Sequence, residues 1–257
     1  AARSPVAAGV LAALAVCTKV SYVLYVMALT YALRRSAKSW LVFVTAGAVT
    51  GLALVTPFLP ELLSPLRDAS TVVARQSPWR IVLTALRQVL PDSFAGNLVS
   101  LGVWVLVALI VWRLGKVLPR RTVVPAEVAP GTFAAASPVT ADALWAAALL
   151  GTAWLLSATY AYAWYDVIAW APLILLVPSG VDLVVLTRMA TVALAYVPGM
   201  VLDPPGALGS ITTTINGTIA PLVGLGLVLV VLVRPRWLTA GALGQGSGSG
   251  SLRRPDG

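Results

Sequence analysis

The sequence has no histidine, a single cysteine and few charged residues. The lack of histidine excludes acid–base or metal chemistry based on imidazole. Cys17 has no second cysteine to pair with, so neither a disulfide nor a thiolate metal cluster can form within the chain. It lies in an apolar run, where we expect it to be a small packing residue. We therefore expect no metal site and no cofactor.

Charged residues make up only 11% of the 257 residues, hydrophobic residues make up 59%, and the mean hydropathy is +0.90. These values exclude an ordinary soluble domain and a disordered chain. The 18 basic residues outnumber the 9 acidic ones. They lie between apolar runs, which fits the cytoplasmic loops of a membrane protein better than a nucleic-acid-binding patch. We predict an all-α, polytopic transmembrane helical bundle of about seven or eight spans, with membrane lipids but no nucleic acid among its partners.

The first apolar runs, 5–18 and 20–33, are separated by Lys19. They form either one long tilted helix with a buried lysine or two short segments that meet at Lys19, since a full span needs about 20 residues. A further span is expected at 40–58. Segment 59–97 mixes proline, charge and apolar residues, and is expected to be an external amphipathic loop. Within it, Ser77 and Pro78 predict a helix start, and the helix either lies in the membrane surface or packs on the bundle.

The second half predicts further spans at 98–112 and 141–158, joined by a cytoplasmic linker over 113–141. We expect the chain then to return through 166–186. Ending that helix at Pro178 is the alternative, but it would leave Arg188 alone inside the membrane, at a cost of at least about 2.5 kcal/mol. An outward span at 189–201, an external loop over 199–216 and a last span at 219–233 follow. The bundle thus covers residues 1–233, and 234–257 forms a basic, Gly/Ser-rich disordered tail.

The orientation follows from the distribution of basic residues. Segments 34–38, 113–121 and the tail contain three, four and four basic residues, eleven in all, with Asp256 as the one acidic residue among them. The positive-inside rule therefore places these segments, and the C-terminus, in the cytoplasm. Segments 59–97 and 199–216 are then external, and we expect a multi-pass protein of the plasma membrane.

The stretch Ser157–Pro178 contains Tyr160, Tyr162, Trp164 and Tyr165 directly before Asp166. Such rings are typical of the membrane–water boundary. Asp166 is interpreted either as a solvated cap at a helix start or as part of a polar cavity that the aromatic residues line. Both interpretations place this stretch at the outer end of the bundle.

Lys19, Arg75 and Arg80 are expected on the same external side, where cationic side chains suit the phosphate of a lipid head group. Aromatic rings beside a carboxylate suit a sugar, because the rings stack on its apolar face and the carboxylate accepts from its hydroxyls. Trp164, Tyr165 and Asp166 are therefore the candidate sugar- or acceptor-binding residues.

Three stretches resemble the GT-C glycosyltransferases, and among them the polyprenyl-phosphate-mannose-dependent α-mannosyltransferases of high-GC Gram-positive bacteria. The stretch LAALAVCTKVSYVL resembles a small-residue helix that ends in a lysine before an aliphatic span. The stretch RQSPWRIVL resembles a helix start in the external loop. The stretch YAWYDVIAWAPLILL resembles the family's Pro-Trp-Tyr-Leu-Leu-Trp-type segment. The likeness covers most of residues 5–202 and concerns the C-terminal half of such enzymes.

The resemblance implies transfer of a hexose, with mannose as the first candidate, from a polyprenyl-phosphate donor to an extracytoplasmic glycan or glycolipid. Lys19, Arg75 and Arg80 would then bind the donor phosphate. Two residues depart from the pattern, because Ala163 replaces the usual proline and Asp166 replaces an aliphatic residue. Family members place their catalytic acidic residue in a first external loop that has no counterpart here. We expect a fragment that lacks the general base, and the catalytic residues are unknown.

Two other functions remain open from the sequence. A lipid or solute transporter would also place charge and aromatic rings at a cavity, and would favour broken helices in matching positions of two halves. Pro178-Ser179-Gly180 is one such break, but no internal repeat is evident. A noncatalytic membrane scaffold would need no converging charge on the external face.

Overall fold

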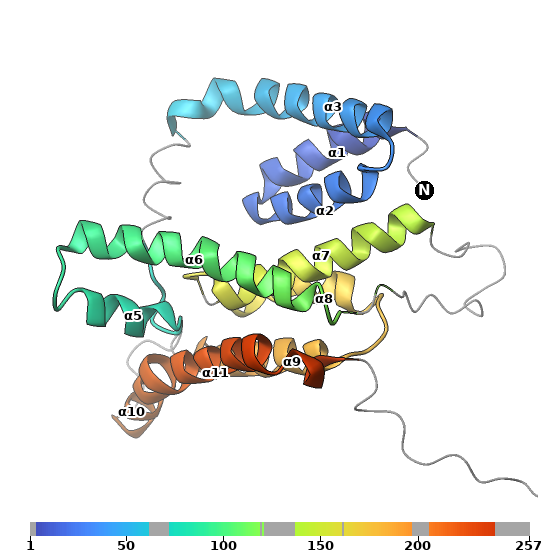
Figure 1. The fold of residues 1–257 in the computed structure, drawn as a ribbon. Helices are drawn as coiled ribbons and strands as arrows, with labels where there is room; N and C mark the ends of the chain where they lie inside the picture. Colours follow the sequence, from blue (N-terminus) through green and yellow to red (C-terminus); the bar gives the residue numbers. More distant parts are fainter. Residues whose placement is uncertain are drawn as a thin grey trace, which may run out of the picture.

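Every regular element is a helix in the residues that the computed structural model describes, which are 4–61, 72–118, 120, 137–160, 162–196 and 206–239 (Figure 1). The all-helical prediction is confirmed for these residues. The longer elements are α1 (Pro5–Thr18), α2 (Val23–Leu33), α3 (Ala37–Val55), α5 (Trp79–Leu86), α6 (Asp92–Leu114), α7 (Pro138–Ser157), α8 (Val167–Leu173), α9 (Gly180–Tyr196), α10 (Gly206–Thr214) and α11 (Ala220–Val233). Short turns of 3₁₀ helix are η1 (Val20–Tyr22), η2 (Thr56–Phe58), η3 (Ala163–Tyr165) and η6 (Pro235–Leu238), and η5 (Ile215–Ile219) is a π-helix.

Four helices in the described part of the chain are long and apolar enough to cross a membrane. They are Ala37–Glu61, Asp92–Leu114, Pro138–Ser157 and Gly206–Val233. The helices α1 and α2 are apolar but shorter. A membrane-embedded helical protein is therefore supported, whereas the predicted count of seven or eight spans is not confirmed.

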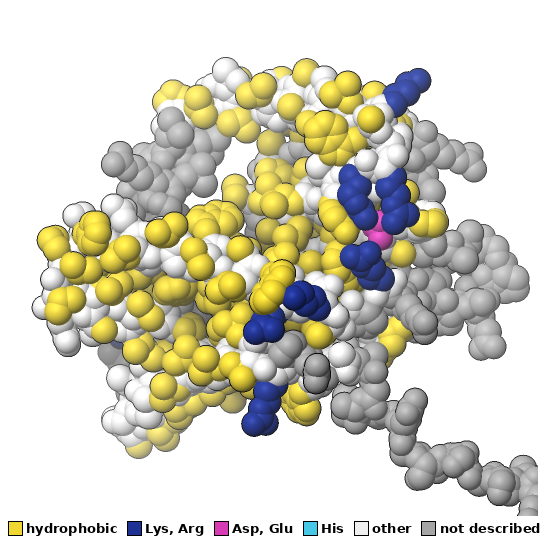
Figure 2. Space-filling model, in the orientation of Figure 1, with side chains coloured by type: hydrophobic (Ala, Val, Ile, Leu, Met, Phe, Trp, Pro, Cys, Tyr) yellow, Lys and Arg dark blue, Asp and Glu magenta, His cyan; other side chains and the backbone are white. Residues whose placement is uncertain are grey.

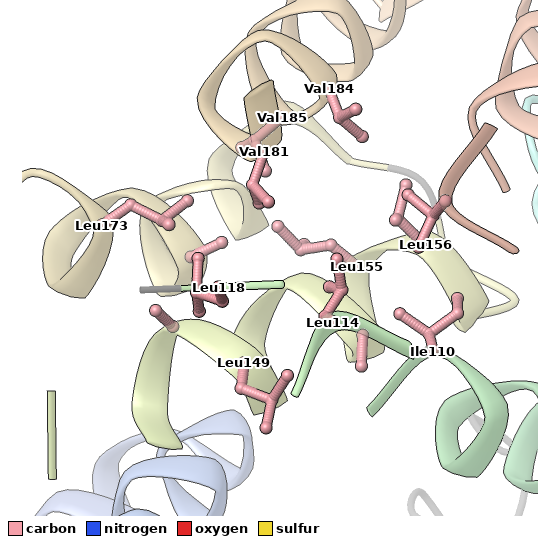
Figure 3. Close-up of a cluster of buried hydrophobic side chains, with 14 of the residues drawn as sticks. Ile110, Leu114, Leu118, Leu149, Leu155, Leu156, Leu173, Val181, Val184 and Val185 are labelled. Carbon is pink, nitrogen blue, oxygen red and sulfur yellow. The ribbon is translucent and has the colours of Figure 1, made fainter. Parts of the chain in front are cut away.

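Helix α7 lies at the centre of the bundle and packs against α2, α6 and α8. Its sequence alternates bulky residues with alanine and glycine, and small residues let neighbouring helices approach closely. In Figure 3, Leu149, Leu155 and Leu156 of α7 lie among side chains from α6, α8 and α9. The predicted span at 141–158 corresponds closely to this helix.

The N-terminal segments reverse direction at Lys19, whose extended backbone separates α1 from η1 and α2. This confirms the interpretation as two short segments. Helix α1 packs on α3 at Gly9, where an added Cβ atom would clash with the carbonyl oxygen of Phe43. Cys17 is exposed on α1, so the expectation that it is a packing residue is wrong.

Helix α5 begins one residue after Pro78, close to the predicted start. It packs on α6 through Leu83, and the Trp79 ring lies against Gly102, where a Cβ atom would approach it to 2.7 Å. Packing on the bundle, the second of the two interpretations, is therefore observed. Helix α6 already begins at Asp92, so the segment expected as an external loop to residue 97 ends earlier.

The prediction of one continuous return helix over 166–186 is wrong. Helix α8 ends at Leu173, and α9 begins at Gly180, where the Asp182 carboxylate accepts a hydrogen bond of 2.6 Å from the Ser179 backbone N–H. Gly180 lies against Leu238 of η6, just beyond the end of α11. The turn thus lies at Pro178-Ser179-Gly180, the alternative first set aside, and Arg188 lies inside α9.

Residues 206–216, expected in an external loop, are also helical. Helix α10 continues through the π-helix η5 into α11 without a break, so the last helix begins at Gly206 and not at Ile219. Four stretches of the predicted segments lie outside the described residues: external-loop residues 62–71, linker residues 119 and 121–136, loop residues 199–205 and tail residues 240–257.

Candidate functional site

The candidate site begins where the segment before α5 is held against the end of α7. The backbone N–H of Ala74 donates to the Thr159 carbonyl at 3.0 Å, and the Trp79 Nε1–H donates to the Ser157 carbonyl at 2.6 Å. The Ser77 hydroxyl donates to the Ala158 carbonyl at 3.3 Å. The last carbonyls of a helix lack intrahelical partners, so these donors satisfy groups that would otherwise be left unpaired. They also fix the positions of the arginines that flank Ser77.

Arg75 and Arg80 line one groove of about 550 Å³. Its other lining residues are Ile81, Thr84, Ala85, Gln88 and Gly217. No acidic side chain lines this groove, and none forms a salt bridge with either arginine within the described residues. Two exposed guanidinium groups with hydroxyl and amide neighbours, and without a counter-ion, are suited to binding an anion such as phosphate.

Lys19 lies elsewhere on the same end of the bundle. Its Nζ is 4.6 Å from the centre of the Tyr165 ring, a cation–π contact. Lys19 does not line the groove of Arg75 and Arg80. The structure therefore brings together two of the three predicted phosphate-binding residues and places the third beside a predicted sugar-binding residue.

The aromatic residues form one stacked cluster. The rings of Tyr162 and Trp164 are parallel within 5°, with centroids 4.7 Å apart. Tyr196, at the end of α9, meets both rings edge-on, at centroid distances of 6.1 Å and 4.9 Å. The ring centroid of Tyr165 lies 6.2 Å from that of Tyr162, and Tyr165 lies between this cluster and Lys19. The cluster thus connects the Lys19 side of the site with the Arg75 side.

A second, smaller pocket of about 260 Å³ adjoins the groove and shares Arg75 with it. Its remaining lining residues are Ala74, Gln76, Tyr162, Ala195, Tyr196 and Asn216. Among the described residues, aromatic rings, two amides and one guanidinium therefore face one small space. This set of groups can stack on a ring and exchange hydrogen bonds with hydroxyls.

Asp166 lies inside the bundle. It is fully buried and forms a salt bridge with Arg188 of α9, which is 6% exposed. The Arg188 Nε–H also donates to the Leu155 carbonyl at 3.0 Å. Asp166 makes no side-chain hydrogen bond to the first turn of α8, so its interpretation as a solvated cap is wrong. One carboxylate oxygen of Asp166 pairs with Arg188 and the side chain is fully buried, so Asp166 is not among the proposed ligand contacts.

The opposite end of the bundle carries a basic cluster. Arg34 and Arg35 both lie near Asp142, at 3.2 Å and 3.5 Å, and Arg120 lies over the Trp145 ring at 4.3 Å. In Figure 2, dark blue side chains gather along one side of a largely hydrophobic face. The two short segments predicted to be cytoplasmic are thus adjacent in space.

Sequence reasoning missed Gln76, Tyr196 and Asn216 of the smaller pocket. Tyr196 closes an apolar run at its expected outer end, so the aromatic-belt pattern could have indicated it. Asn216 was assigned to a loop, and no sequence pattern distinguishes it from other loop residues. Comparison with known proteins adds no assignment, because no family model, curated protein or solved structure matches the chain.

Proposed function

We propose that the chain is part of a membrane glycosyltransferase that transfers a hexose, with mannose as the first candidate, from a polyprenyl-phosphate donor to an extracytoplasmic glycan or glycolipid. The observation that carries the proposal is the groove in which Arg75 and Arg80 converge without a counter-ion among the described residues, next to a pocket of aromatic rings and amides. A phosphorylated sugar needs both kinds of surroundings side by side. The stretches that resemble GT-C enzymes include both arginines and Tyr162.

The chemistry would use the arginines where negative charge develops. In the transfer step the bond between C1 of the sugar and the phosphate oxygen breaks, and its electron pair leaves with the phosphate. The acceptor oxygen bonds to C1 and its proton passes to a general base, to which we assign no residue of this chain. Guanidinium groups aimed at the departing phosphate stabilise that charge in the transition state.

The proposed orientation places this site outside and the basic cluster in the cytoplasm of a plasma-membrane protein. The salt bridges of Arg34 and Arg35 to Asp142, and Arg120 over Trp145, support it because they gather two basic segments at one end of the bundle. The turn at Pro178-Ser179-Gly180 packs against Leu238, which lies near the C-terminal end of α11. Arg234 follows that end of the helix. The positive-inside rule then puts the C-terminus in the cytoplasm.

Arg80→Gln is expected to weaken binding of a short-chain polyprenyl-phosphate hexose by about ten- to a hundredfold, because a hydrogen bond to a charged group contributes about 1.5–3 kcal/mol. Titration calorimetry on the purified chain in detergent measures this affinity. The matched control is Arg87→Gln, which removes an arginine from the end of the same helix. Arg87 pairs with Asp92 at 3.1 Å and does not line the groove.

Arg87→Gln should therefore leave the affinity unchanged. Equal affinities of the Arg80→Gln and Arg87→Gln variants would show that the groove is not the phosphate site. Failure of the wild-type chain to bind the donor would overturn the proposed function.

A further inference from the structure

The π-helix η5 lies within the long helix from Gly206 to Val233, next to the candidate site. A π-helical turn has poorer geometry than an α-helical one, and such bulges are frequent at functional sites. Here the bulge supplies a residue to each of the two compartments, since Gly217 lines the groove of the arginines and Asn216 lines the smaller pocket. The irregularity therefore coincides with the junction of the two.

The side-chain oxygen of Asn216 is inaccessible to solvent and has no hydrogen-bond partner in the described part of the structure. A buried acceptor without a partner is costly, and native proteins usually satisfy it with a protein group, an ordered water or a ligand. An amide both accepts and donates, as a sugar hydroxyl does. A hydroxyl bound in the pocket reaches this oxygen if the Asn216 side chain rotates towards the pocket that the residue lines.

The remaining lining residues point to the same class of ligand. Tyr162 and Tyr196 offer aromatic surface, and Gln76 supplies a second amide. Among the residues that the structure describes, no carboxylate lines the pocket, and the one charged residue that does, Arg75, is shared with the groove. These surroundings suit a neutral hydroxylated ring that is attached to an anionic group on the Arg75 side.

We propose that the pocket formed by Gln76, Tyr162, Tyr196 and Asn216 is the hexose subsite of the donor, with Asn216 presented to a sugar hydroxyl by the π-helical bulge. This rests on the proposed function, because the phosphate of the same molecule occupies the groove of Arg75 and Arg80. It shifts sugar recognition from Trp164, Tyr165 and Asp166 to Tyr162 and three residues that were not predicted. Tyr162 then takes part in recognition while its other contacts hold the aromatic cluster together.

The test compares two ligands, a short-chain polyprenyl-phosphate hexose and the same prenyl phosphate without the sugar. Asn216→Ala should weaken binding of the sugar-bearing ligand by up to about tenfold, the effect of losing one neutral hydrogen bond. It should leave binding of the sugar-free phosphate unchanged. Arg80→Gln should weaken binding of both ligands.

The matched control is Asn97→Ala, which makes the same chemical change at an exposed position of α6, and it should alter neither affinity. Gln76→Ala provides a second variant outside any helix, in case Asn216→Ala disturbs the bulge, and should show the same selectivity for the sugar. Circular dichroism and thermal unfolding confirm that each variant is folded.

The outcomes separate the two proposals. If Asn216→Ala and Gln76→Ala bind both ligands as the wild type does, while Arg80→Gln weakens both, the hexose subsite is wrong and the phosphate groove stands. Equal weakening of both ligands by Asn216→Ala and Gln76→Ala also overturns the subsite. If the wild-type chain binds neither ligand, the proposed function fails with it.

Discussion

Arg188→Met is expected to lower the free energy of unfolding by about 3–5 kcal/mol, because it leaves the buried Asp166 carboxylate without its counter-ion. It also removes the hydrogen bond from the Arg188 Nε–H to the Leu155 carbonyl. Reversible unfolding in mixed micelles measures the loss. This is the largest effect that we expect from any single substitution in the described bundle.

Two further variants test whether the loss of stability comes from breaking the ion pair or would follow any substitution in α9. The double variant Asp166→Leu with Arg188→Met removes both charges, and should recover much of the lost stability, because replacing a buried pair by apolar residues is often neutral or favourable. Arg87→Met makes the same change in an exposed pair with Asp92, and should cost less than about 1 kcal/mol. If Arg188→Met unfolds like the wild type, the buried pair has no role in stability.

Gly151→Val is expected to destabilise the protein by about 1–3 kcal/mol through overpacking. A Cβ atom at Gly151 would lie 2.8 Å from the Ile168 carbonyl oxygen and 3.2 Å from the Cα of Ala169. Both are backbone atoms of α8, so relief requires α8 to move. The Ile168 carbonyl also accepts a hydrogen bond of 2.9 Å from the Tyr25 hydroxyl, which such a movement would disturb.

The matched control for Gly151 is Gly96→Ala in α6, where an added Cβ atom meets nothing within 4 Å. Alanine favours a helix over glycine by about 1 kcal/mol, so this control should stabilise the protein slightly. Gly151→Ala should lie between the wild type and Gly151→Val. A Gly151→Val variant as stable as the wild type would show that α7 and α8 do not pack this closely.

Most of the helices could be predicted from the sequence, because long apolar runs and their end signals are local properties. The span at 141–158 and the break at Lys19 follow from apolar runs and one charged residue. The helix start near Trp79 follows from Ser77 and Pro78, which act within one turn. Local rules of this kind do not depend on which helices are neighbours.

The path of the chain between Asp166 and Tyr196 could not be predicted, because it depends on a contact between two helices. The cost of an unpaired arginine in a membrane favoured a place for Arg188 at a helix end. In the structure Arg188 lies inside α9, and Asp166, 22 residues earlier, pairs with Arg188. An unpaired arginine in a membrane is costly, as expected, but the sequence does not show which residue pairs with Arg188.

The candidate site was predicted in part. Its charged groove follows from Arg75 and Arg80, and its aromatic character follows from the stretch that contains Tyr162. Asn216, which lines the pocket, lies in a π-helical turn where a loop was expected. A change from loop to helix redirects side chains, so residues that join a site through such a turn are found only from the structure.

The most direct test of the proposed function is a crystal structure of the chain with a short-chain polyprenyl-phosphate hexose bound. We expect density for the phosphate between Arg75 and Arg80, and density for the sugar ring against Tyr162 and Tyr196, within reach of Asn216. Density for the phosphate at the other end of the bundle, beside Arg34 and Arg35, would contradict the proposed function.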